Sequence, residues 1–365
     1  MPNTDTKLEK ARKIINEVDA KMRELFLQRM EAAHLVADYK KERGLAIFDP
    51  IREEEVIRRN SENIEDEELK EYYINFLRGN MAISRSYQSR LMEGMKVAYS
   101  GTEGAFAHIA ATKLYPSAKK VAFGDFASAY RAVEKGECDV AVLPVENSYN
   151  GEVGQVTDLM FSGSLYVNGM FDLPVTQDLL AKPGTKIEEI REVVSHPQAF
   201  GQCAEYIKRH SFTRHEFANT ALAARWVAEN DDKTVAAIGS REASEIFGLT
   251  VLDHDINENK SNSTRFAIFS RVANKRIAKD SGVHSILLFT VRNEAGALAK
   301  AIDVIGKYGF NMRTLRSRPM KELLWEYYFY VELEGNIQSE EGASLMESLG
   351  EFCDKLRFAG TYIKL

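Results

Sequence analysis

Three patterns of apolar and polar positions follow one another along the chain, and the first predicts one very long helix. Its apolar and small residues recur at steps of three and four, the period of a helix that buries one face. These positions are Leu8, Ala11, Ile15, Val18, Met22, Leu25, Ala32, Val36 and Tyr39. Nothing from Asp5 to Arg43 breaks the pattern before Gly44. The helix would be about 55 to 60 Å long.

A helix of that length needs an equally long surface to cover its apolar face. The same segment predicts two shorter helices, from about Pro50 to Asn60 and from about Asp66 to Glu93, which are too short for this. A second copy of the chain is the simplest partner, so we expect a homo-oligomer held together by the helical segment.

From Lys96 onward, short β-rich runs alternate with helical stretches, the pattern of an open α/β sheet. Four such runs end in polar or glycine residues and lead toward a helix. They lie at 97–106, 139–147, 193–198 and 234–240. In open α/β sheets ligands bind beyond the carboxyl ends of the strands, so we expect the four junctions to converge on one cleft.

The last segment follows a short basic linker, from about Asn274 to Gly282, and predicts a small sheet with two helices. The expected order is strand, helix, strand, strand, helix, strand, as in a ferredoxin-like fold. The expected strands are Val283–Val291, Asn311–Arg318, Leu323–Leu333 and Phe358–Lys364, and the expected helices are Ala295–Lys307 and Ser339–Asp354.

Length and composition are those of a globular protein with more than one domain. The 365 residues exceed one typical domain of about 150 and allow two to three. A net charge of -6 gives no reason to expect nucleic acid or an anionic membrane as a partner. Cys138, Cys203 and Cys353 are far apart and odd in number, which suggests neither a disulfide framework nor a metal motif. Because the N-terminus is polar and no apolar run approaches about 20 residues, we expect a cytoplasmic protein.

Basic residues interrupt the apolar face of the long helix. Arg29 takes a position that the pattern reserves for an apolar side chain, and a buried guanidinium is costly unless it meets an anion. Lys40 lies about 16 Å further along the same face, whereas Arg12 is about 25 Å from Arg29, too far for one small ligand. In a dimer Arg12 could serve the second copy's site. The alternative is a coiled-coil seam whose basic side chains extend into solvent.

The two shorter helices carry polar groups at matching positions. The run Asp49–Glu53 places Pro50 in a first helical turn, followed by a cation and a carboxylate. Ser84 and Gln88 are four apart and share a helix face. With the long helix, this segment closely resembles the all-helical chorismate mutases, which are intertwined dimers. The residues that carry the resemblance are Arg12, Arg29, Lys40, Asp49, Arg52, Glu53, Ser84 and Gln88.

The resemblance implies the rearrangement of chorismate to prephenate, which needs no covalent step. The protein holds a dicarboxylate in a compact conformer and stabilises charge on the breaking ether oxygen. It assigns the two carboxylates to Arg29 and to Arg12 of a second copy, with Ser84 supporting one of them. It assigns the ether oxygen to Lys40 and Gln88 as donors.

The same resemblance gives the remaining groups of the helical segment supporting roles. Glu53, together with the backbone near Asp49, would hold the ring hydroxyl of the substrate. Arg52 would complete the cationic lining.

A second candidate site lies where the polar loop Asn257–Ser263 runs into the β-rich stretch Thr264–Phe269. Loop-borne polar groups at such a strand edge commonly bind ligands, although an ordinary turn before a core strand is the alternative. The glycines at Gly101 and Gly104 lack the spacing of a dinucleotide fingerprint or a P-loop, which disfavours a hydride-transfer enzyme. His196 stays open between a general base, a metal ligand and a residue that stabilises a turn.

Four motifs of this middle segment look like the prephenate dehydratase family. They are Gly101–Phe106, Pro144–Ser148, Ser195–Gln198 and Thr264–Phe266. The resemblance implies a fold like the type II solute-binding proteins, with two lobes joined by two crossings and the active site in the cleft between them. The crossings are expected near Leu173–Asp178 and Val251–Asn257, and the last strand would bring Thr264 opposite Asn147.

The implied reaction is the loss of carbon dioxide and water from prephenate. It needs a donor at the leaving hydroxyl and anchors for two carboxylates. By resemblance Thr264 is the donor, and Asn147 and Gln198 position the ring hydroxyl. Arg265 and Ser148 belong to the expected substrate-binding set.

The last segment resembles the ACT regulatory domain of the same enzymes, which binds phenylalanine between paired domains. The implied effector residues are Gly296, Ala297, Leu298, Asn311 and Ser317. The helix N-terminus at Gly296 suits a carboxylate. Arg316 stands where the family usually has glutamate, which reverses a charge beside the expected effector site and leaves the strength and sign of the response open.

The resemblance therefore predicts three domains. They are an all-α intertwined chorismate mutase domain at 1–93, a two-lobed α/β dehydratase domain at 96–273 and a ferredoxin-like ACT domain at 283–365. It implies chorismate and prephenate as substrates, L-phenylalanine as effector, no metal or other cofactor, and a dimer, with a tetramer left open.

Two alternatives belong to other classes of protein. A non-catalytic amino-acid sensor would leave Arg29, Lys40 and Gln88 unexplained. A mutase fused to a dehydrogenase would need the nucleotide fingerprint that the glycine loop lacks.

Overall fold

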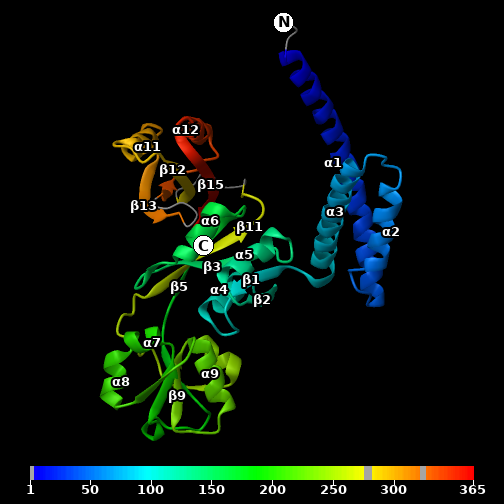
Figure 1. Cartoon of the computed structure of the whole chain (residues 1–365). Coiled ribbons are helices and arrows are strands. Elements are labelled where there is room, and N and C mark those ends of the chain that lie inside the picture. The colour runs from blue at the N-terminus through cyan, green and yellow to red at the C-terminus, as the bar shows by residue number, and fades with distance from the viewer. Residues whose placement is uncertain (1–3, 275–281, 321–325) are drawn as a thin grey trace. The chain divides into compact units, whose positions relative to one another are not determined.

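The computed structural model describes residues 4–274, 282–320 and 326–365 (Figure 1). The chain forms two compact units, Met1–Met95 and Lys96–Leu365. Within the described ranges, no helix is both long and apolar enough to cross a bilayer. Over the same residues, no three His, Cys, Asp or Glu side chains gather as a metal site would require.

The first unit consists of the three predicted helices. They are α1 (Thr4–Arg43), α2 (Pro50–Ser61) and α3 (Glu67–Glu93). Asp49 and Asp66 begin the two shorter helices, because their side chains accept backbone N–H groups of the first turn. Pro50 occupies the first helical turn of α2, where its missing N–H has no partner to lose.

Helix α1 is covered by its own unit over only part of its length. Ala33 and Ala37 are buried where α1 packs against α3. The apolar positions nearer its N-terminus are exposed, and they include Leu8, Ile15, Val18, Met22 and Leu25. Most of the face whose spacing predicted the helix therefore has no cover within the unit.

The second unit begins with a six-stranded sheet, the first lobe, in the order β2-β1-β3-β11-β5, with β4 paired to β3. Strands β1, β2 and β3 are parallel, and β11 runs antiparallel to β3 and β5. Helices α4, α5 and α6 pack on it. The bounds are β1 (Lys96–Ser100), α4 (Phe106–Leu114), β2 (Lys119–Phe123), α5 (Phe126–Glu134), β3 (Val140–Asn147), β4 (Gly151–Glu152), α6 (Gly154–Ser162), β5 (Tyr166–Pro174) and β11 (Ser263–Ser270).

The second lobe is a five-stranded sheet in the order β10-β6-β9-β7-β8. Its elements are β6 (Asp178–Ala181), η1 (Ile187–Glu189), β7 (Glu192–Ser195), α7 (Pro197–Gln202), α8 (Ala204–His210), β8 (Thr213–Glu216), α9 (Thr220–Glu229), β9 (Val235–Gly239), α10 (Arg241–Phe247) and β10 (Thr250–Asp253). The predicted two lobes are confirmed. The chain crosses first between Pro174 and Asp178, as predicted, and returns between Asp253 and Ser263. The return is later than predicted because β10 extends to Asp253.

The C-terminal sheet has the order β13-β14-β12-β15. Its elements are β12 (Val283–Val291), α11 (Ala297–Lys307), β13 (Asn311–Pro319), β14 (Tyr327–Glu334), α12 (Glu340–Gly350) and β15 (Cys353–Ile363). The predicted order of strands and helices is confirmed. The residues 275–281 of the expected linker, and 321–325 at the expected start of the third strand, lie outside the described residues.

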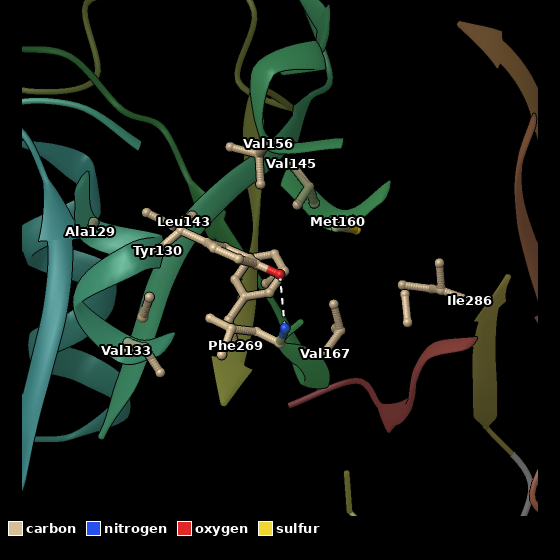
Figure 2. Close-up of a cluster of buried hydrophobic side chains, with 14 of the residues drawn as sticks. Ala129, Tyr130, Val133, Leu143, Val145, Val156, Met160, Val167, Phe269 and Ile286 are labelled. Atoms are coloured by element: carbon tan, nitrogen blue, oxygen red, sulfur yellow. Dashed lines mark hydrogen bonds between the residues drawn. The ribbon is translucent and has the colours of Figure 1, made fainter. Parts of the chain in front are cut away.

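The first lobe and the C-terminal sheet share one hydrophobic core. Figure 2 shows part of it, with Leu143 and Phe269 from the first lobe and Ile286 from β12. The Tyr130 hydroxyl, inside this cluster, accepts the backbone N–H of Leu165 at 3.0 Å. The C-terminal sheet is therefore packed into the second unit.

Candidate active sites

A cleft of about 380 Å³ lies between the two lobes of the second unit. The first lobe contributes Ala105, Phe106, Asn147, Asn150, Gly151, Glu152, Val153 and Thr264, and the second contributes His196, Gln198, Ala199, Gln202, Ala218, Asn219 and Thr220. Val175 and Gln177 line it from the first crossing. A cleft between lobes, lined by convergent polar groups, is the usual place for a small ligand.

Asn147 and Thr264 meet in this cleft, as the sequence predicted, because β11 pairs with β3 so that they stand opposite each other. Asn147 Nδ2 donates to Thr264 Oγ1 at 2.9 Å, to Asn262 Oδ1 at 2.9 Å and to the Ser263 carbonyl at 3.1 Å. Asn147 Oδ1 accepts the backbone N–H of Asn150 at 2.9 Å. The amide is thus fixed, and because Thr264 Oγ1 accepts from it, the threonine hydrogen is left to be donated elsewhere.

Arg265 does not face the cleft. Successive residues of a strand point to opposite faces, so Arg265 lies behind Thr264. Its Nε and Nη2 donate to the two carboxylate oxygens of Asp172 at 2.7 and 3.1 Å. These hydrogen bonds raise the pKa of Arg265 and lower that of Asp172. The expectation that Arg265 anchors a substrate carboxylate disagrees with this placement.

Ser148 is also held outside the cleft. Its Oγ accepts the backbone N–H of Ser263 at 2.9 Å, and it is absent from the described lining. It joins the hairpin to β11, so the structure does not bring it to a substrate.

Three of the four predicted junctions reach the cleft, and the fourth does not. Ser240, at the end of β9, is buried and accepts the backbone N–H of Ala243 as the cap of α10. The start of α9, at Asn219 and Thr220, lines the cleft instead. His196 Nδ1 accepts the backbone N–H of Gln198 at 3.2 Å, in agreement with the turn-stabilising interpretation.

Gln177 is a cleft residue that the sequence did not indicate. It is 2% exposed, and its Nε2 donates to Gln202 Oε1 at 3.2 Å. Its Oε1 has no hydrogen-bond partner among the described residues. Buried polar atoms are normally paired, so an acceptor of this kind is one that a bound ligand can satisfy. An isolated glutamine between two strands gives no local signal of this role.

In the helical unit, Arg29 on α1 meets α3. Its Nη1 donates to Ser84 Oγ and to the Asn80 carbonyl, the latter at 3.2 Å. Burial lowers the pKa of Arg29, and the charge of Glu53 opposes that change. Gln88, one turn beyond Ser84, is buried, and its Oε1 has no hydrogen-bond partner within the described ranges.

The other predicted groups of this unit are more dispersed. Lys40 Nζ donates to the Ile47 carbonyl at 2.5 Å. Glu53 forms an ion pair with Arg85 of α3, which the sequence analysis did not identify. Arg12 lies on α1, about 25 Å along the helix from Arg29.

Asp49 and Arg52 lie at the start of α2. Asp49 accepts the Arg52 backbone N–H at 3.0 Å, which makes it a helix cap. The Arg52 guanidinium is exposed and pairs with Glu55 at 3.1 Å. Neither contact brings these side chains to Arg29.

Four of the five predicted effector residues flank α11, and the fifth, Ser317, lies within β13. Gly296, with φ of 86°, precedes the helix, and Ala297 and Leu298 begin it. Asn311, which donates to Glu334 Oε2 at 2.9 Å, begins β13 after the helix has ended. Eleven helical residues span about 16 Å, so Gly296 and Asn311 stand far apart in one chain.

Ser317 and Arg316 are neighbours on β13 and point to opposite faces of the sheet. Arg316 donates to Glu146 of the first lobe. The departure from the family pattern at Arg316 therefore bears directly on the dehydratase lobe.

A two-lobed α/β domain whose cleft is lined by two threonine hydroxyls and six amide side chains, preceded by a helical unit that holds Arg29 partly buried against Ser84, defines a multidomain enzyme for small polar substrates. The prephenate dehydratase family matches residues 97–274, and the chorismate mutase type II family matches residues 11–89. The bifunctional chorismate mutase/prephenate dehydratase of Neisseria gonorrhoeae is 32% identical over 359 residues, which cover 96% of this chain and 95% of that one. The chain belongs to the bifunctional chorismate mutase/prephenate dehydratase family, and it is an enzyme with both activities.

Two solved structures resemble the second unit. A prephenate dehydratase of Arthrobacter aurescens in complex with L-Phe is 26% identical, with a TM-score of 0.67, covering 74% of this chain and 90% of that one. A protein described as a novel type of quorum quenching acylase is 28% identical, with a TM-score of 0.68, covering 74% of this chain and 98% of that one.

Proposed function

We propose that the cleft between the two lobes converts prephenate to phenylpyruvate, carbon dioxide and water, with Thr264 as the donor to the leaving hydroxyl. The hydrogen bond from Asn147 Nδ2 to Thr264 Oγ1 carries this proposal. Since the threonine oxygen accepts from the amide, its hydrogen is directed to the substrate. The bond between the ring and its carboxylate breaks, and its electron pair completes the aromatic ring as the carbon–oxygen bond of the ring hydroxyl breaks. The departing hydroxyl takes the Thr264 proton and leaves as water, and Thr264 regains a proton from solvent.

Gln198 and the unpaired oxygen of Gln177 are the proposed positioning groups across the cleft. Both line it, and neither amide can ionise, so they orient the substrate without changing the charge of the site. Asn147 contacts the substrate ring hydroxyl together with Thr264. In this proposal Arg265 has a structural role behind the cleft.

The helical unit is proposed to rearrange chorismate to prephenate. Arg29, oriented by Ser84, binds one carboxylate, and Arg12 of a second copy binds the other. Lys40 and Gln88 donate to the ether oxygen, Gln88 through the N–H groups of its amide. Glu53, fixed by Arg85, receives the ring hydroxyl near Asp49, and Arg52 adds positive charge at the rim.

A dimer through α1 is part of the same proposal. The exposed apolar face of α1 supports it, because monomeric proteins rarely leave a long apolar stripe in water. Arg12 also lies too far from Arg29 to act in the same chain. A tetramer requires a further interface, and cytoplasmic location stays a prediction.

The C-terminal sheet is proposed to be an ACT domain, so that the three domains lie at 1–93, 96–273 and 283–365. L-phenylalanine would bind between two copies, with Gly296, Ala297 and Leu298 from one and Asn311 and Ser317 from the other. The separation of Gly296 from Asn311 within one chain supports a shared site. The phenylalanine complex of the Arthrobacter relative supports the choice of ligand.

The test is incubation of the purified protein with chorismate and no added cofactor, following prephenate and phenylpyruvate separately, with and without phenylalanine. Formation of both products is expected. Prephenate alone would reject the dehydratase proposal, and no turnover would favour an amino-acid sensor. Unchanged rates at saturating phenylalanine would reject the regulatory part.

A further inference from the structure

Two arginines of the C-terminal sheet reach the hairpin that carries Asn147. Arg316 Nη2 donates to Glu146 Oε1, and Arg318 Nη1 lies 3.6 Å from Glu152 Oε2. Arg316 and Arg318 are two residues apart on β13, so their side chains leave the same face. Glu146 and Glu152 are direct partners across the β3–β4 pair. Two neighbouring cations of β13 therefore contact two neighbouring carboxylates, and Glu146 also lies 3.8 Å from Arg265 Nη1 on the other side of its carboxylate.

The held hairpin forms one wall of the cleft. Asn147 follows Glu146 directly and pairs with Gly151, and both line the cleft, as does Glu152. Glu146 and Asn147 are consecutive residues of β3, and their side chains point to opposite faces. A displacement of the Glu146 backbone toward or away from Arg316 therefore also moves Asn147 relative to Thr264. The hydrogen bond that directs the threonine hydroxyl thus depends on where the hairpin is held.

The two ion pairs are partly buried. The Arg316 and Glu146 side chains are 29% and 32% exposed, and those of Arg318 and Glu152 are 23% and 19% exposed. Arg318 Nε also donates to Asp158 at 3.0 Å, which fixes its guanidinium. Charge-assisted hydrogen bonds with reduced solvent access are stronger than exposed surface pairs.

Gly154, the first residue of α6, gives independent support. A Cβ at Gly154 would overlap the Arg318 guanidinium. Gly154 has no positive φ, so its backbone conformation would accept alanine. Glycine at this position provides the space through which Arg318 approaches the hairpin.

We infer that Arg316 and Arg318 form a clamp of positioning residues for the dehydratase site, through which the C-terminal sheet sets the geometry of Asn147 and Thr264. The clamp touches no substrate and acts through Glu146 and Glu152. A displacement of β13 would therefore move the hairpin that carries Asn147. This inference rests on the dehydratase function proposed for the cleft.

The test compares Arg316→Gln with Arg313→Gln in the full chain. Arg313 is the matched control because it is on the same strand and pairs with Glu334 of the C-terminal sheet, at 3.8 Å. We expect Arg316→Gln to lower the dehydratase kcat about tenfold, with a smaller change in KM, because the substrate still binds but the donor is misplaced. Arg316→Lys, which keeps the charge, should recover part of that loss. Arg313→Gln should leave kcat unchanged.

Gly154→Ala is the second variant, and it changes no charge. It should lower the dehydratase kcat by displacing Arg318, while the mutase rate of the same preparation stays constant. The mutase rate is an internal measure of correctly folded enzyme, since Arg316 and Gly154 lie in the other unit.

Three results would overturn the clamp. They are a dehydratase kcat of Arg316→Gln within about twofold of the unmodified chain, equal losses in Arg316→Gln and Arg313→Gln, and a parallel loss of both activities with soluble protein. An unmodified chain that forms no phenylpyruvate would instead reject the proposed function itself, so the two failures are distinguishable.

Discussion

Replacing Thr264 by valine removes one hydroxyl and keeps the shape of the side chain. Asn147 Nδ2 would retain two acceptors, Asn262 Oδ1 at 2.9 Å and the Ser263 carbonyl at 3.1 Å. The loss of a single shared hydrogen bond should therefore cost about 1 kcal/mol of folding free energy or less. Removing a general acid typically costs about a hundredfold or more in rate, which is about 2.7 kcal/mol. The catalytic loss should thus clearly exceed the loss of stability.

The assay measures phenylpyruvate formed from saturating prephenate, and the mutase rate of the same preparation serves as the internal standard. Thr264→Ser is the matched control, because serine keeps a hydroxyl that can accept from Asn147 and donate to the substrate. We expect it to stay within about tenfold of the unmodified rate. A shift of the melting temperature, measured for both variants, reports the structural cost separately.

A dehydration rate of Thr264→Val within about tenfold of the unmodified chain would show that another group is the donor. Equal losses in the valine and serine variants would show that the exact packing at this position matters more than the hydroxyl. Either result would refute the role derived from the Asn147 hydrogen bond.

Three further changes test other parts of the structure. Gln88→Leu should lower the mutase kcat about a hundredfold without lowering the melting temperature, because a buried unpaired oxygen is removed; a clear loss of stability would contradict this. Burial lowers the pKa of His108 below 6.5, so the free energy of unfolding should decrease as pH falls from 6.5 toward the folded pKa. Urea titrations should show a smaller slope in His108→Gln, with the remainder expected from His284, whose pKa burial also lowers; an unchanged slope would contradict the contribution of His108. Gly360→Ala should destabilise the second unit by more than about 2 kcal/mol. Gly360 has φ of 136°, and a Cβ there would overlap the backbone of β5. Gly350→Ala, the control, should be nearly neutral in the same denaturant titration.

The periodic elements could be predicted from the sequence because each follows from local chemistry. Steps of three and four gave α1, and Asp49 with Pro50 gave the start of α2. The position of Thr264 opposite Asn147 came from the family resemblance. Arg265, expected among the carboxylate anchors, instead pairs with Asp172 on the face of β11 opposite Thr264, as the alternation of side chains along a strand requires.

The sequence did not predict the contacts between residues that are far apart along the chain. Glu53 and Arg85 are 32 residues apart on different helices, and nothing local marks them as a pair. Gln177 became a cleft residue only because the crossing between lobes runs beside it. The role of such a polar side chain follows from its neighbours in the folded structure and not from the local sequence.

The packing of the C-terminal sheet leads to a final prediction. Because the C-terminal sheet follows a basic linker in the sequence, it could be expected to fold as a separate domain. In the structure, however, its residues Ile286 and Tyr330 belong to the same buried cluster as Leu143 and Phe269 of the first lobe. A chain ended after residue 274 would expose that cluster to water, at a cost of about 25 cal/mol per Å² of apolar surface. It should lose soluble dehydratase activity, while the helical unit, which is compact by itself, should keep its mutase activity. A truncated chain with an unchanged dehydratase kcat would show that the first lobe is stable without the C-terminal sheet, and that the shared core contributes little to folding.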